Sequence, residues 1–157
     1  MNREEQYRAA LDAAAKQLSY RALSAKALGD KLLEKGHAED AVAYALAWLA
    51  ERHLLDDAAY AESVVRSCAR KGYGARRIRQ ELTRRGVDRE TADAAMLGFA
   101  PDENRLTALL DKRLRGDVSN RREVDKAVAY LQRRGFSWGE IRDALAAYGQ
   151  SLPDELE

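Results

Sequence analysis

Apolar residues recur at intervals of three and four along most of the chain, which is the spacing of a helix with one buried face. Leu106, Leu110 and Leu114 form one clear run of this kind, with charged and polar residues between them. Only Pro101 and Pro153 could interrupt such helices, and no segment convincingly alternates apolar and polar residues as a strand would. The pattern therefore predicts an all-α protein.

The helices follow an internal repeat. The segments KLLEKGH, ELTRRGV and YLQRRGF place Gly36, Gly86 and Gly135 about fifty residues apart. Each glycine suits the left-handed backbone that ends a helix, and the basic residues before it suit the helix dipole. The aligned apolar positions are Leu32, Leu82 and Leu131 four before the glycine, Val42, Ala92 and Ile141 six after, Leu46, Met96 and Leu145 ten after, and Leu49, Phe99 and Tyr148 thirteen after.

A further helix precedes each of these helix pairs, so the repeat predicts three tandem three-helix modules. The expected modules are residues 1–55, 56–100 and 101–157, the last with a short acidic tail. Asp56 and Asp57 are expected to cap the start of the second module, and Pro101-Asp102 to mark the start of the third. Modules of about 50 residues bury little apolar surface alone, so we expect them to pack on their neighbours in an elongated, curved helical-repeat protein.

The third helix of each module has a different start. Ser137 and Glu140 have the spacing of a capping box. Asp88 occupies the same capping position in the second module, whereas the first module has Ala38 there. Because alanine offers no side-chain acceptor, the helix after Ala38 should have the weakest start of the three.

Charge is unevenly distributed along the 157 residues, although the net charge is only +1. The first 64 residues carry 8 basic and 11 acidic side chains, whereas residues 66–89 carry nine basic side chains against Glu81 and Asp88. A hydrophobic content of 46% is enough to build a core, so disorder is not expected. The local excess therefore predicts a basic patch on a folded second module.

A patch of this kind suits phosphate, because arginine binds phosphate and carboxylate oxygens at two points. The candidate residues for binding DNA or a partner are Arg66, Arg70, Lys71, Tyr73, Arg76, Arg77, Arg79, Arg84 and Arg85. Second-rank candidates, offset by nearby acidic residues, are Arg113, Arg115, Arg121, Arg122, Arg133 and Arg134. The alternative is a solvated helix face with internal ion pairs, but two anions cannot neutralise nine cations.

Other classes of site have little support in the sequence. Cys68 is a single cysteine in an apolar helical position, and His37 and His53 have no partners at metal-ligand spacing. Trp48 and Trp138 are interpreted as packing residues. We therefore expect no metal site, no cofactor and no catalytic residues, and hence no enzyme. No signal peptide or membrane span is recognisable, which favours the cytoplasm.

The segment LLDDAAYAESVVRSCARKGYGARRIRQELTRRGV, residues 54–87, resembles the central part of the RecX family, bacterial regulatory proteins that act on the recombinase RecA. The likeness rests on the Leu-Asp-Asp stretch, the Tyr60-Ala61 pair, the Gly72-x-Gly74 turn and the basic-basic-Gly helix end. It extends from about Ala9 to Tyr148 and is strongest in the middle of the chain. Where the family usually has proline, this chain has Ala75.

The resemblance implies three tandem three-helix modules, no enzymatic activity and, as partner, a RecA filament on single-stranded DNA. The family role is to limit filament growth and to lower ATP hydrolysis, strand exchange and co-protease activity, which connects the chain to DNA repair, homologous recombination and the SOS response. Our hypothesis is that the basic patch contacts DNA phosphates or acidic RecA residues in the filament groove. We expect a monomer, which could also bind duplex DNA.

The alternative is a stand-alone DNA- or RNA-binding protein that inserts one helix into the major groove in the manner of a helix-turn-helix. The threefold repeat argues against it, because such a regulator usually needs one unit and a dimer interface. The sequence leaves open whether a filament-binding protein would cap filament ends or coat the groove. It also leaves open inhibition or activation, because the sign depends on which filament state is bound more tightly.

Overall fold

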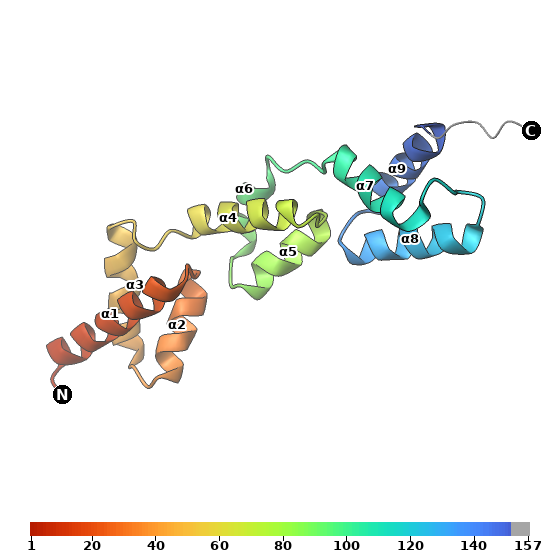
Figure 1. The fold of residues 1–157 in the computed structure, drawn as a ribbon. Coiled ribbons are helices and arrows are strands. Elements are labelled where there is room, and N and C mark those ends of the chain that lie inside the picture. The colour runs from red at the N-terminus through yellow and green to blue at the C-terminus, as the bar shows by residue number, and fades with distance from the viewer. Residues whose placement is uncertain (152–157) are drawn as a thin grey trace, which may run out of the picture. The chain divides into compact units, whose positions relative to one another are not determined.

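A computed structural model describes residues 1–151, and this part of the chain consists of helices joined by short turns (Figure 1). The first repeat holds α1 (Arg3–Tyr20), α2 (Ala25–Glu34) and α3 (Glu39–Glu51); the second holds α4 (Asp57–Arg70), α5 (Ala75–Arg84) and α6 (Arg89–Met96); the third holds α7 (Glu103–Leu114), α8 (Arg121–Arg133) and α9 (Trp138–Ser151). No strand occurs in residues 1–151. The all-α repeat of three-helix modules is confirmed, while the expected acidic tail lies outside the described residues.

The helices group into two compact units that do not coincide with the three repeats. The first unit is Met1–Val64 with Glu81–Leu97, and the second is Val65–Gln80 with the described residues from Gly98 on. The division falls inside α4 and inside α5. Each unit is therefore described by itself.

In the first unit, α1, α2 and α3 contact one another around one apolar core. Leu28 and Leu32 of α2 are fully buried, and Val42 and Leu49 of α3 pack in the same cluster. Ala10 of α1 has no accessible surface, and its small side chain lets neighbouring helices approach closely. The apolar positions around Gly36 thus form a core, as the repeat predicted.

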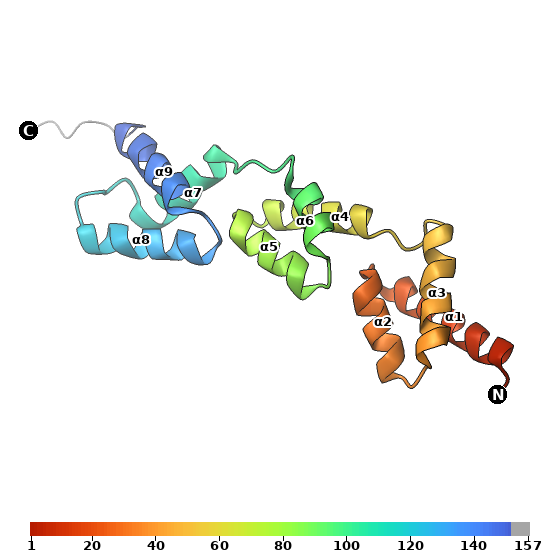
Figure 2. The same ribbon diagram turned by 180° about the vertical axis from the view of Figure 1, so that it is seen from behind.

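In the second unit, α7, α8 and α9 also contact one another (Figure 2). Their core includes Leu110, Leu131 and Ile141, all essentially without accessible surface. The buried Tyr148 keeps its hydroxyl satisfied: it donates to Asp111 Oδ1 and accepts from the Gly116 amide, both at 2.7 Å. Burial and the hydrogen bond to Asp111 raise the pKa of this phenol.

The helix starts and ends follow the local signals in the sequence. Ser137 Oγ accepts from the Glu140 amide at 3.1 Å, and Glu140 Oε1 accepts from the Ser137 amide at 2.9 Å, which completes the capping box. Asp88 accepts from the Thr91 amide at 2.8 Å, whereas Ala38 makes no side-chain cap. The glycines that end α2, α5 and α8, Gly36, Gly86 and Gly135, have φ of 92°, 85° and 99°, as predicted.

Three local predictions need correction. Asp56 caps α4 through the Ala59 amide at 3.1 Å, but Asp57 accepts from the Ala25 amide at 2.9 Å and so supports the start of α2. The repeat predicts Phe99 on the buried face of the third helix of its module, but α6 ends at Met96. Phe99 therefore lies after the helix and is only half-buried. Trp138 is 54% exposed, because it is the first residue of α9 and the buried face of that helix begins at Ile141.

Two sequence interpretations hold. Cys68 is buried in α4, and Trp48 packs against the core of the first unit. No group of three His, Cys, Asp or Glu side chains within residues 1–151 is arranged to hold a metal ion. In the same range, no helix is long and apolar enough to cross a bilayer.

Candidate functional site

The candidate basic residues fall mostly into the second unit. It carries Arg66, Arg70, Lys71, Tyr73, Arg76, Arg77 and Arg79, together with the second-rank Arg113, Arg115, Arg121, Arg122, Arg133 and Arg134. Most of these side chains are exposed, and Tyr73, Arg77 and Arg134 are half-buried. Arg84 and Arg85 belong to the first unit. The fold thus gathers basic residues of the second and third repeats into one unit.

Arg84 and Arg85 are already paired with an acid. Arg84 Nη2 lies 2.5 Å and Arg85 Nε 2.9 Å from Oε1 of Glu81, whose side chain is only 12% exposed. The hydrogen bond from Arg84 and that from Arg85 hold the pKa of Glu81 below its usual range, although burial opposes them. These two arginines therefore share one carboxylate, which partly neutralises their charge for an external anion.

The turn between α4 and α5 contacts the turn between α8 and α9 backbone to backbone. The Gly74 amide donates to the Arg134 carbonyl at 2.8 Å, and the Arg76 amide donates to the Gly135 carbonyl at 3.1 Å. A Cβ on Gly74 would lie 2.5 Å from the Gly135 carbonyl oxygen, so only glycine permits this approach. Gly74 of the Gly-Tyr-Gly stretch therefore joins two repeats.

Arginines of the third repeat complete the hydrogen bonding at the end of α4. Arg105 donates to the Arg70 carbonyl, and Arg134 donates to the carbonyls of Lys71 and Gly72, the last at 3.2 Å from its Nε. Carbonyls at a helix end lack partners within the helix and attract cations. Arg134 thus has a structural role, and Arg105 joins the site although sequence reasoning missed it, because nothing around it in the sequence signals a distant partner.

Arginine and tyrosine side chains alternate in a stack that we call the Arg–Tyr ladder: Arg113, Tyr130, Arg134, Tyr73 and Arg77. The Arg113 guanidinium carbon lies 3.7 Å from the ring centroid of Tyr130, and that of Arg134 lies 5.5 Å from the same ring. Arg134 and Arg77 lie over the Tyr73 ring at 4.8 Å and 4.6 Å. These distances are typical of cation–π contacts, so Tyr73 already packs against two guanidinium groups.

The remaining second-rank residues do not form one cluster. Arg121 and Arg122 begin α8, whereas Arg133 lies in its last turn. A helix of 13 residues separates its ends by about 20 Å. Arg115 follows α7 in a left-handed conformation with φ of 51°. The second-rank set is therefore divided. Arg133 lies at the end of α8 that carries Arg134 of the ladder, whereas Arg121 and Arg122 lie at the opposite end of the helix.

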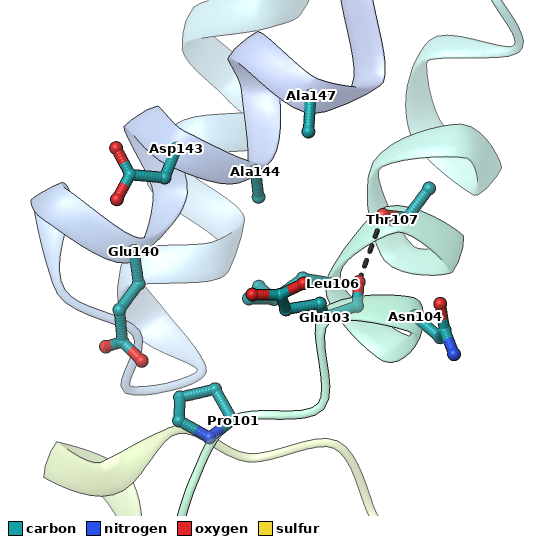
Figure 3. Close-up of a pocket in the computed structure, with 9 residues that line it drawn as sticks. All are labelled: Pro101, Glu103, Asn104, Leu106, Thr107, Glu140, Asp143, Ala144 and Ala147. Carbon is teal, nitrogen blue, oxygen red and sulfur yellow. Dashed lines mark hydrogen bonds between the residues drawn. The ribbon is translucent and has the colours of Figure 1, made fainter. Parts of the chain in front are cut away.

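The second unit also has an open hollow of about 360 Å³ between α7 and α9 (Figure 3). Leu106, Ala144 and Ala147 give it an apolar surface, with Glu103, Asn104 and Thr107 on α7 and Glu140 and Asp143 on α9 beside Pro101. Thr107 donates to the Glu103 carbonyl at 3.0 Å. The lining is acidic and apolar, so it does not suit the phosphate predicted for the basic patch.

Comparisons with known proteins agree on one family. Family models for the first, second and third three-helix domains of RecX match residues 10–49, 56–96 and 101–145. The protein named Regulatory protein RecX of Chromohalobacter salexigens is 40% identical over 136 residues, covering 86% of this chain and 90% of its own. That of Vibrio parahaemolyticus is 36% identical over 137 residues, with 86% and 88% covered.

Solved structures agree with the sequence comparisons. The crystal structure of RecX from Lactobacillus salivarius matches with a TM-score of 0.87 at 24% identity, over 94% of this chain and 99% of that one. A second structure, titled as that of regulatory protein RecX, matches with a TM-score of 0.80 at 28% identity, over 90% and 73%. The relatives are thus named as regulators, which is consistent with a protein that is not an enzyme.

Proposed function

Because the chain belongs to the RecX family of regulatory proteins, we propose that it binds RecA filaments on single-stranded DNA and inhibits them. One structural observation carries the proposal within this family. The second unit gathers exposed cations from two repeats, of which Arg66, Arg70 and Lys71 make no side-chain hydrogen bond or ion pair within residues 1–151. Such a surface attracts a polyanion.

The cations at the end of α4 bind phosphates in this proposal. Each phosphate that a lysine or arginine neutralises releases condensed counterions, so binding is strong at low salt and weakens steeply as salt rises. The backbone under Arg70 and Lys71 is fixed by Arg105 and Arg134, which limits the entropy lost when these side chains order on DNA.

The first unit contacts RecA itself in this proposal. Its exposed large hydrophobic residues include Tyr20, Leu54 and Leu97, and residues 1–64 carry an acidic excess. Apolar side chains can pack against a protein surface, whereas they offer nothing to a phosphate. Protein and DNA contacts together would make the chain specific for a filament over naked DNA.

Inhibition follows if the chain binds a filament state that neither grows nor hydrolyses ATP efficiently, because a ligand shifts an equilibrium toward the state that it binds more tightly. The proposed activity needs binding alone, without a catalytic group or cofactor. RecA filaments form on chromosomal DNA, so the proposed place of action is the cytoplasm, and a single chain suffices.

The test is the steady-state ATPase rate of preformed RecA filaments on single-stranded DNA. We expect the rate to fall when the protein is added at one molecule per many RecA protomers. The triple variant Arg66→Gln, Arg70→Gln and Lys71→Gln should need at least about tenfold more protein for half-inhibition, because three phosphate contacts contribute roughly one salt-sensitive counterion each.

The matched control removes the same charge elsewhere. Lys112, Lys126 and Arg142 are exposed residues of the second unit outside both candidate sets, and changing all three to glutamine should leave inhibition within about twofold of wild type if the effect is local. An unchanged ATPase rate at equimolar protein would contradict the proposal. A protected duplex site without RecA would instead support the stand-alone DNA-binding alternative.

A further inference from the structure

The Arg–Tyr ladder brings three positive charges together without a carboxylate. Arg113, Arg134 and Arg77 take part in no ion pair within the described part of the chain. The partners of Arg134 are backbone carbonyls, which accept hydrogen bonds but do not cancel its charge. Like charges repel, so this arrangement costs free energy that a bound anion would offset.

The two tyrosine rings hold the guanidinium groups in place. Tyr130 belongs to α8 and packs against the core of the second unit, while Tyr73 lies in the turn fixed by Gly74 and Gly135. A guanidinium group stacked on an aromatic ring keeps its N–H edge available, because stacking uses only its face. The ladder is therefore preorganised, and little side-chain entropy remains to be lost on binding.

The two arginines at the ends of the ladder, Arg77 and Arg113, have N–H groups that are not used in hydrogen bonds. Neither Arg77 nor Arg113 forms a hydrogen bond through its guanidinium group with any described residue; Arg113 is exposed and Arg77 is half-buried. Arg134, in the middle, uses two of its nitrogens on the carbonyls of Lys71 and Gly72. Arg134 therefore contributes its positive charge and separates the two tyrosine rings, but has few N–H groups left for a phosphate.

We infer that the Arg–Tyr ladder binds the phosphate backbone of single-stranded nucleic acid, with Arg77 and Arg113 as the phosphate-contacting residues and Tyr73 and Tyr130 as positioning residues. This inference rests on the proposed function and deepens it, because it adds a site that crosses from the second repeat into the third. The rings are engaged by arginines, so they do not stack on bases. Binding at the ladder is consequently independent of base sequence.

An acidic protein surface is a poorer fit. Contacts between proteins rely on exposed apolar and aromatic anchors, whereas Tyr73 and Tyr130 are half-buried and covered by arginines. The exposed large hydrophobics among the described residues of the second unit are Val118 and Trp138. Neither belongs to the ladder. A row of like charges instead matches a chain that repeats one negative charge per nucleotide.

The test measures binding of a fluorescently labelled oligothymidylate by anisotropy, without RecA, over a range of salt concentrations. Arg113→Gln should raise the dissociation constant about fivefold and lower the salt slope by about one, as the loss of one phosphate contact requires. Arg142→Gln is the matched control: Arg142 is an exposed arginine of the same unit outside the ladder, and its loss should change affinity less than about twofold.

Variants of Tyr130 test whether the ring must hold the arginines in place or whether their positive charge alone is sufficient. Tyr130→Phe keeps the ring and should bind like wild type, whereas Tyr130→Leu keeps every charge, frees Arg113 and Arg134 from the ring, and should weaken binding about threefold or more. Arg113→Lys, which keeps the charge but not the planar group, should also weaken binding and serves if Tyr130→Leu fails to fold by circular dichroism.

Unchanged affinity and salt slope in Arg113→Gln would overturn the inference, and so would equal affinities of Tyr130→Leu and Tyr130→Phe. Ladder variants that keep DNA affinity but lose binding to RecA alone would assign the ladder to an acidic protein surface and also overturn it. The proposed function fails separately. If the wild-type protein binds the oligonucleotide through the ladder but leaves the RecA ATPase unchanged, the ladder stands and the filament role does not.

Discussion

Gly36 and Gly135 share a left-handed backbone but meet different surroundings. Gly36 has φ of 92°, and a Cβ there would meet no atom within 4 Å. Gly135 has φ of 99°, and its Cβ would lie 2.4 Å from the Arg77 amide nitrogen. Gly36 therefore only ends a helix, whereas Gly135 also permits the close approach of the α8–α9 turn to the α4–α5 turn.

Alanine substitutions should separate these two roles. Gly36→Ala should lower the free energy of unfolding by about 1–2 kcal/mol, the cost of a left-handed conformation for a residue with a Cβ. Gly135→Ala adds a clash with backbone that cannot move aside, so its loss should exceed about 3 kcal/mol. Urea unfolding followed by circular dichroism measures both, and equal losses would mean that the turn contact contributes nothing.

The third helices of the three repeats differ in how their first turns are satisfied. Ser137 and Asp88 accept from amides of α9 and α6, whereas Ala38 leaves the first amides of α3 without a side-chain partner. Ala38 already has the extended conformation of a capping residue, with φ −69° and ψ 150°. The backbone at Ala38 therefore has the conformation of a helix cap, but alanine has no side-chain oxygen that could accept the hydrogen bond.

Ala38→Ser should for this reason stabilise the protein. A serine hydroxyl at this position can accept from an amide of the first turn, which is worth about 0.5–2 kcal/mol. The control is Ala43→Ser, an equally exposed change inside α3, which should cost a few tenths of a kcal/mol because serine forms helices less well than alanine. A melting temperature that is unchanged or lower in Ala38→Ser would refute this.

One type of junction recurs between successive repeats in the whole molecule. In the first unit, Ser24 Oγ donates to the Arg85 carbonyl at 2.6 Å, beside Gly86. In the second unit, the Gly74 amide donates to the Arg134 carbonyl at 2.8 Å. Ser24 and Gly74 occupy matching positions of the repeat, as do Arg85 and Arg134. Each junction thus joins the first turn of one repeat to the second turn of the next.

Ser24→Ala tests how much such a junction contributes. Ser24 is fully buried, and its hydroxyl both donates to Arg85 and accepts from the Ala27 amide at 3.1 Å. Its removal leaves a buried carbonyl unsatisfied and α2 without its cap, so we expect a loss of about 2–3 kcal/mol.

The control for this change is Ser19→Ala. The exposed Ser19 hydroxyl only donates to the Lys16 carbonyl, so its loss should cost less than about 0.5 kcal/mol. Hydrogen exchange should show faster opening of both α2 and α6 in Ser24→Ala. Opening confined to α2 would mean that the junction does not couple the two repeats.

Much of the fold could be predicted because its signals are local. The helix period, the left-handed glycines and the capping box each depend on residues within about four positions, and Leu32, Leu82 and Leu131 are buried as the repeat required. The pairing of Glu81 with Arg84 and Arg85 is also local. It could have been read from the three- and four-residue spacing, although the predicted patch counted both arginines as available.

The sequence by itself determined the class of fold, the repeat and the region of positive charge, because each of these depends on short-range spacing and composition. Apart from the local pairing of Arg84 and Arg85 with Glu81, only the tertiary structure decided which cations are held by a partner and which are available. Asp57 meets Ala25, Arg134 meets Lys71, and Arg113 meets Tyr130 only because the helices between them pack. Contacts between residues distant in sequence arise from that packing, and no local pattern encodes them.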